Sequence, residues 1–104
     1  MTALNDIASR EIIPGFHAKF VHGVQSTMAF WDIKKGSSMP EHFHAHEQIT
    51  YISEGELEMY IGGEKILFTT GMVHVIPANT PHSAIALKDS RVIDSFSPAR
   101  DDYR

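Results

Sequence analysis

The stretch GSSMPEHFHAHEQITYISEG, from Gly36 to Gly55, carries histidines at three alternating positions: His42, His44 and His46. In an extended segment, alternate side chains lie on one face at a spacing of roughly 6.6–6.8 Å. Two neighbours at that spacing can lean toward one metal ion, whereas the outer two of three stand roughly 13 Å apart at Cα. We therefore expect two of the three histidines to bind metal and the third to point elsewhere.

Which two histidines bind depends on the residues that complete the site. If residues 45–47 connect two strands, the chain reverses there and Gln48 returns beside His42 and His44. A further imidazole is available at His82, directly after the proline-containing turn at 77–81. Three imidazoles and one amide oxygen suit a first-row divalent metal, and Mn, Fe, Ni, Co and Zn all accept such ligands.

The composition limits the class of protein. A chain of 104 residues with 42% hydrophobic residues corresponds to one domain that can build its own core. The absence of cysteine excludes disulfides and thiolate metal sites. A net charge of −4 without a basic stripe argues against nucleic acid and membrane partners. No apolar run reaches the roughly 18 residues of a membrane span and no signal peptide pattern is present, so we expect a cytoplasmic protein.

A period of two residues dominates the chain and predicts an all-β protein without a helix longer than about one turn. Residues 1–10 are expected to form an arm. In the strand expected at 26–33, Met28 and Phe30 share one face while Ala29 and Trp31 share the other, which predicts packing on both faces. Further strands are expected at 12–13, 16–22, 49–52, 57–61, 65–68, 71–76, 83–87 and 91–97.

Two segments resemble the two signatures of the cupin family. In the first, residues 36–55, Gln48 stands where that signature normally has glutamate. In the second, residues 71–86, Asn79 replaces a glycine and Ala86 replaces a frequent asparagine, while His82 is present. Because asparagine tolerates a left-handed turn, the exchange at position 79 is mild.

The resemblance implies a single cupin domain over residues 1–104, folded as an antiparallel β-barrel or jelly roll with a metal inside its mouth. The ligand set that it implies is His42, His44, Gln48 and His82. In cupins that associate, the leading segment often crosses to the partner subunit, so the resemblance also implies a homodimer.

The last expected strand carries an acidic residue in an apolar setting. Asp94 and Phe96 share one face of residues 91–97. If that strand pairs with the strand of His82 across the turn at 88–90, this face can look into the same cavity as the metal. A buried aspartate is costly unless it is paired or functional. Either Arg91, Arg100 or a backbone amide holds Asp94, or Asp94 acts in the metal cavity.

The segment Asp94-x-Phe96-Ser97-Pro98-x-Arg100 resembles the ending of the KdgF-type cupins of pectin degradation. This resemblance implies an enzyme that converts 4,5-unsaturated galacturonate-type monosaccharides to the linear 4-deoxy-5-keto uronate. Asp94 and Arg100 would be catalytic, and Phe96 and Arg100 would contact the anionic sugar. Two other functions stay open: an oxidative, dioxygenase-like cupin that uses iron or manganese, and a non-catalytic module that binds a sugar or another small ligand.

The charge of the ligand set favours the uronate reaction. Histidine and glutamine are neutral ligands, so a bound dication keeps its full double positive charge. Such a site attracts an anionic, oxygen-rich substrate. It also favours Lewis-acid chemistry over oxygen activation, in which a carboxylate ligand commonly stabilises higher oxidation states.

Overall fold

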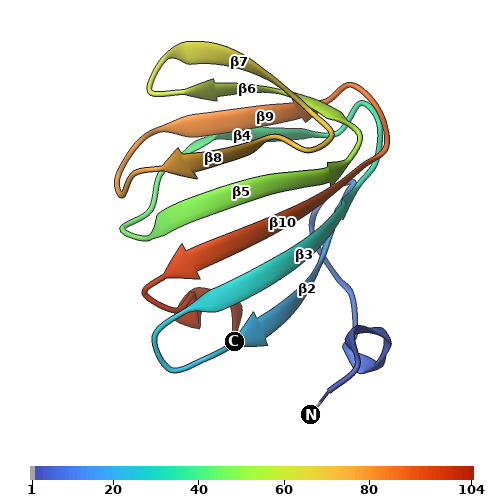
Figure 1. The fold of residues 1–104 in the computed structure, drawn as a ribbon, viewed down its shortest axis with the longest axis vertical. Helices are drawn as coiled ribbons and strands as arrows, with labels where there is room; N and C mark the ends of the chain where they lie inside the picture. The colour runs from blue at the N-terminus through green and yellow to red at the C-terminus, as the bar shows by residue number, and fades with distance from the viewer. Residues whose placement is uncertain (1) are drawn as a thin grey trace.

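The computed structural model describes residues 2–104, which fold into one six-stranded and one four-stranded sheet with two short 3₁₀ turns (Figure 1). The elements in chain order are η1 (Leu4–Asp6), β1 (Arg10–Ile13), β2 (Phe16–His22), β3 (Thr27–Ile33), β4 (Ser38–His42), β5 (Glu47–Glu54), β6 (Glu56–Ile61), β7 (Glu64–Thr69), β8 (Val73–Ile76), β9 (His82–Ala86), β10 (Ser90–Ser97) and η2 (Asp101–Tyr103). Within residues 2–104, no helix is long and apolar enough to cross a membrane.

The strands form a jelly roll. The larger sheet has the order β1-β2-β3-β10-β5-β8, the smaller has the order β4-β9-β6-β7, and neighbouring strands are antiparallel. Figure 1 shows the small sheet above the large one, with the C-terminal end beside β2. The all-β, jelly-roll prediction is therefore confirmed, and each expected strand lies within a few residues of an observed one.

Alternation along the central strands directs every second side chain into one core between the sheets. On β3, Ala29, Trp31 and Ile33 are buried, and they pack with residues of β5, β6 and β10. The prediction that β3 packs on both faces holds only in part, because on its other face Phe30 is half-buried whereas Met28 is 42% exposed. The outer face of the large sheet has no second layer over it within residues 2–104, so apolar residues there remain in contact with solvent.

The pairing of the His82 strand with the Asp94 strand, which the sequence left as a condition, does not form. β9 lies between β4 and β6 in the small sheet, whereas β10 lies between β3 and β5 in the large sheet. Residues 87–89 carry the chain from one sheet to the other. A hydrogen bond from the Leu87 N–H to the Glu56 carbonyl fixes this crossing at 2.9 Å. His82 and Asp94 therefore reach the interior from separate sheets.

Candidate metal centre

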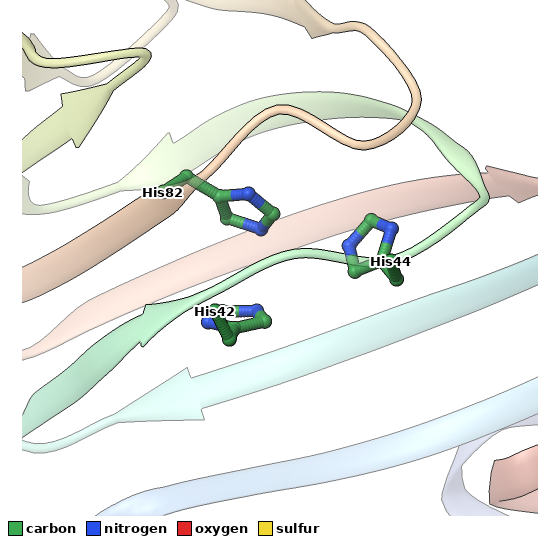
Figure 2. A group of neighbouring side chains, drawn as sticks. All are labelled: His42, His44 and His82. Carbon is green, nitrogen blue, oxygen red and sulfur yellow. The ribbon is translucent and has the colours of Figure 1, made fainter.

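Three histidines meet at one end of the barrel, inside its mouth. Antiparallel pairing of β4 with β9 makes His42 and His82 direct partners, with ring centroids 4.3 Å apart. His44 follows two residues after His42, beyond the end of β4, and its ring centroid lies 5.0 Å from that of His82. One nitrogen from each ring lies within 4.8 Å of the other two, and the rings face a common point (Figure 2).

Backbone carbonyls hold the three rings in a uniform orientation. In each histidine, Nδ1 lies within hydrogen-bond distance of a carbonyl oxygen two residues away along the chain. An Nδ1–H donated to a carbonyl places the proton on that nitrogen and leaves the lone pair of Nε2 free for a metal. The pairs are His42 with Pro40 at 3.0 Å, His44 with His46 at 3.0 Å, and His82 with Thr80 at 2.8 Å.

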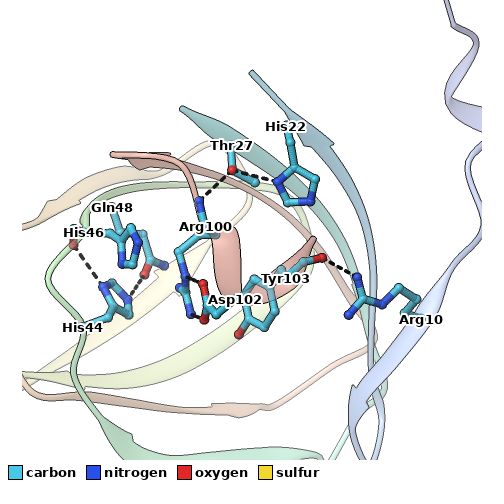
Figure 3. Close-up of polar contacts among 9 residues, drawn as sticks. All are labelled: Arg10, His22, Thr27, His44, His46, Gln48, Arg100, Asp102 and Tyr103. Carbon is cyan, nitrogen blue, oxygen red and sulfur yellow. Dashed lines mark hydrogen bonds and ion pairs between the residues drawn. The ribbon is translucent and has the colours of Figure 1, made fainter. Parts of the chain in front are cut away.

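The amide of Gln48 completes the group from the large sheet. Its Nε2 donates a hydrogen bond of 2.9 Å to Thr50 Oγ1, which leaves Oε1 directed at His44, 3.1 Å from Nε2 (Figure 3). With the Nδ1 proton of His44 given to the His46 carbonyl, these two facing atoms are both acceptors. A cation bound by both atoms removes this mismatch, so the donor set fits a metal ion.

Burial keeps the imidazoles of His44 and His82 neutral. Desolvation, followed by the positive charges of Arg100 and His82, lowers the pKa of His44 from 6.5 to about 4. Desolvation also lowers the pKa of His82 below its ordinary value. At neutral pH both rings are therefore available as metal ligands without first losing a proton.

The third histidine of the alternating series lies outside this group. The connection between β4 and β5 covers residues 43–46 instead of the expected 45–47, because β5 already begins at Glu47. The carbonyl of His46 accepts the Nδ1 hydrogen bond of His44. Its ring lies edge-on to Phe96, with centroids 6.5 Å apart.

Asp94 is buried on the inner face of the large sheet, and Thr50 is its direct partner across β5 and β10. Thr50 Oγ1 donates a hydrogen bond of 2.7 Å to Asp94 Oδ1 and accepts one from Gln48. A hydrogen-bonded chain therefore links the candidate metal ligand to the carboxyl group. Burial raises the pKa of Asp94 from 3.8 to about 6, although Thr50, Gln48 and Trp31 act in the opposite direction.

The arginines considered from sequence as partners of Asp94 form ion pairs elsewhere. Arg91 pairs with Asp32 and Glu54 on the outside of the barrel. Arg100 pairs with Asp102, with Nε and Nη2 at 3.0 and 2.8 Å from the two carboxylate oxygens. The Asp94 carboxyl thus lies in the cavity held by the Thr50 hydroxyl.

Arg100 and Phe96 form the wall of the cavity opposite the small sheet. The Arg100 guanidinium lies 4.7 Å from the centroid of the Phe96 ring, and both residues are buried. Phe96 in turn lies edge-on to His44, with ring centroids 5.7 Å apart. One cavity is thus lined by all of the residues selected from the sequence: His42, His44, Gln48, His82, Asp94, Phe96 and Arg100.

The sequence analysis did not identify three residues that hold the side chains of this cavity in place: Thr50, Asp102 and Tyr103. Thr50 follows Gln48 at strand spacing, so period-two alternation placed it on the same face and offered a signal for it. Asp102 and Tyr103 follow Pro98, where strand periodicity ends, and nothing in the local pattern indicates their position. The inner part of the cavity is apolar, with Phe16, Trp31, Met39, Ile52 and Met59 among its lining residues.

Comparison with known proteins agrees with this architecture. The family model described as "Cupin domain" matches residues 29–94. The pectin degradation protein KdgF of Dickeya dadantii is 38% identical over 71 residues, which span 66% of this chain and 64% of that protein. The match therefore covers less than two thirds of the relative's length.

Two solved structures match nearly the whole chain. KdgF from Halomonas sp. has 33% sequence identity and a TM-score of 0.91, covering 98% of this chain and 96% of that one. An RmlC-like cupin from Shewanella frigidimarina has 25% identity and a TM-score of 0.94, covering 100% and 95%. With the family model matched over more than half of its residues, this chain belongs to the cupin family and has KdgF proteins among its relatives.

Proposed function

We propose that this protein is a metal-dependent enzyme that converts a 4,5-unsaturated, galacturonate-type monosaccharide to the linear 4-deoxy-5-keto uronate. The observation that carries the proposal is one cavity in which four neutral candidate ligands, a buried carboxyl group and a buried arginine converge. Sugars of this kind arise when polysaccharide lyases cleave pectin. A relative named as a pectin degradation protein supports that substrate class.

His42, His44, His82 and Gln48 are the residues that would hold the metal. When bound, a divalent Mn, Fe, Ni, Co or Zn ion would supply Lewis acidity and an attraction for substrate oxygens. Because all four ligands are neutral, they do not offset the charge of the ion. This property favours a negatively charged uronate over a neutral sugar.

Asp94 is the group that we assign to proton transfer. Its carboxylate takes the proton of the anomeric hydroxyl while the bond between C1 and the ring oxygen breaks, giving an aldehyde at C1 and an enolate at C5. The same carboxyl then gives that proton to C4, which converts the enol into the 5-keto product. The reaction consumes neither an oxidant nor water. One positioned acid–base group typically accelerates such a proton transfer by about 10²–10⁴-fold.

Arg100 and Phe96 position the sugar in this proposal. The guanidinium pairs with a carboxylate or hydroxyl of the substrate, because charge-assisted hydrogen bonds of arginine are strong and directional. The ring of Phe96, which contacts both Arg100 and His44, packs against the sugar. The apolar inner wall excludes water from the enol intermediate.

The test begins with metal analysis of the untagged protein, followed by incubation with unsaturated galacturonate. Loss of the enol absorbance that depends on metal, and that proceeds equally without oxygen, is the expected result. Activity only in the presence of oxygen would replace the proposal with an oxidative cupin. Saturable binding without any conversion would replace it with a binding module.

We further propose that the protein forms the homodimer expected from sequence, through the outer face of the large sheet. On that face, register places Val21 opposite Met28 and Ile49 opposite Val75, and Tyr51 lies beside them. All five side chains are between 39% and 49% exposed. Ser95 on β10 lies between the two pairs, and exposed apolar side chains on both sides of it are typical of an interaction face. The cytoplasmic location and the single domain over residues 1–104 stay predictions.

A further inference from the structure

Arg100 is held on three sides by the short C-terminal turn η2 and by β10. Its guanidinium lies between two aromatic rings, 4.7 Å from the centroid of Phe96 and 4.3 Å from that of Tyr103. Asp102 accepts two hydrogen bonds along the Nε–Nη2 edge, at 3.0 and 2.8 Å. The Arg100 side chain is 8% exposed, whereas the Asp102 side chain is 54% exposed, so the pair bridges the cavity and the surface.

These contacts leave one edge of the guanidinium without a protein partner. A guanidinium carries five N–H groups, and Asp102 takes one on Nε and one on Nη2. Nη1 makes no hydrogen bond of standard geometry to residues 2–104, although the Tyr103 hydroxyl lies close enough to help raise the pKa of Arg100. Since both faces are covered by rings and the side chain lines the metal cavity, the remaining N–H groups are directed to whatever occupies that cavity.

Residues from distant parts of the chain hold the turn that carries Asp102 and Tyr103 in place (Figure 3). Arg10 on β1 donates a hydrogen bond of 2.5 Å to the Tyr103 carbonyl, and Phe20 on β2 stacks on the Tyr103 ring at 4.6 Å. The Arg100 backbone N–H donates to the buried hydroxyl of Thr27 at 2.8 Å. The position of the turn is thus set by the body of the barrel.

We propose that Asp102 and Tyr103 are positioning residues that hold Arg100 so that its free Nη edge binds the carboxylate of the substrate. The inference rests on the proposed function, in which Arg100 contacts an anionic sugar. A free arginine side chain samples many rotamers, and ordering it opposes binding. The ring sandwich and the carboxylate fork order the side chain before any substrate arrives.

The same turn contains a matched control. Asp101 pairs with Arg104 on the outer surface, and its side chain is 80% exposed. The variant D101N therefore removes the same charge from the same turn without touching Arg100.

The experiment uses full-length, zinc-loaded protein and two probes, galacturonate as the carboxylate sugar and galactose as its neutral counterpart. Calorimetry measures the dissociation constant of each, and zinc content and thermal midpoint verify that every variant is folded. In D102N and Y103L we expect galacturonate binding to weaken about tenfold or more, the scale of a lost charge-assisted hydrogen bond. Galactose binding in these variants, and binding of both sugars in D101N, should match wild type.

A second readout needs no ligand. The NMR signal of the Arg100 Nε–H, held by Asp102, should be sharp and slow to exchange in wild type and D101N but should broaden in D102N and Y103L. An unchanged Nε–H signal with unchanged galacturonate affinity in D102N and Y103L overturns the positioning role. If R100Q also binds galacturonate like wild type, the substrate role of Arg100 falls as well. If galacturonate affinity falls in R100Q but not in D102N and Y103L, only the positioning role is refuted.

Discussion

Replacing Asp94 with asparagine changes both stability and turnover, and the structure predicts the size and pH dependence of the first effect. In metal-free protein, burial raises the pKa of Asp94 from 3.8 to about 6. That rise corresponds to about 3 kcal/mol against the ionised form at high pH. Asparagine keeps an oxygen for the Thr50 hydroxyl but adds N–H donors that need partners, so we expect a net gain of about 1–3 kcal/mol.

The sign follows from the direction of the shift. Because the folded-state pKa is raised, the stability that Asp94 contributes is complete below about pH 4 and is lost as the pH rises through about 6. The Asp94→Asn variant lacks this titration. Its advantage over wild type should therefore be near zero at about pH 4 and reach its full size by about pH 7.

Urea unfolding of EDTA-treated protein across this pH range measures the difference, with Asp6→Asn as the control at an exposed aspartate. The control should change the unfolding free energy by less than about 0.5 kcal/mol at every pH. The metal-loaded Asp94→Asn protein should retain its metal and lose turnover by about 10²-fold or more. A stability difference independent of pH would refute the reasoning about burial, and retained turnover would remove Asp94 from the proton transfer.

The remaining predictions concern the metal and the association of subunits. His82→Ala should no longer bind stoichiometric metal, as measured by elemental analysis, and metal addition should no longer stabilise it. Wild type should gain about 2.7 kcal/mol of stability at a metal concentration of about 100 times Kd. Equal metal content in the variant and wild type would contradict the site. Gln48→Glu should bind metal more tightly but raise KM for the uronate, since the added negative charge offsets part of the ion's attraction, and an unchanged KM would contradict that reasoning. Tyr51→Glu should be a monomer by the molar mass measured in light scattering, with an unchanged circular dichroism spectrum. The control Glu64→Gln, on the small sheet, should stay dimeric. A dimeric Tyr51→Glu protein would place the interface elsewhere.

Local sequence patterns predicted most of the strands because their determinants are local. Period-two alternation marks residues 57–61, and the two glycines that follow adopt φ values of 58° and 82°, as a tight hairpin turn requires. The histidine spacing at 42 and 44, the glutamine at 48 and the histidine after the turn at 77–81 also indicated a shared site. In the structure these four side chains do converge, from both sheets.

The local sequence pattern did not predict which distant strands pair. The short turn after β9 suggested a hairpin with β10, yet β9 already has β4 and β6 as its neighbours. A strand has only two edges, so competition among all strands for those edges decides the pairing. Met28, which resembles a core residue in sequence, lies on the outer face of the large sheet, where no second layer is present within residues 2–104.

The sequence by itself determined the types of ligand, the strand periodicity and the family, because side-chain chemistry and alternation depend only on residues close together in the chain. The tertiary structure decided that Thr50 joins Gln48 to Asp94, and that Asp102 and Tyr103 enclose Arg100. Thr50 and Asp94 lie 44 residues apart in the chain and meet only because β5 pairs with β10, while Asp102 and Tyr103 lie in a short turn without strand periodicity. Strand pairing and the packing of that turn on the barrel are properties of the folded chain as a whole.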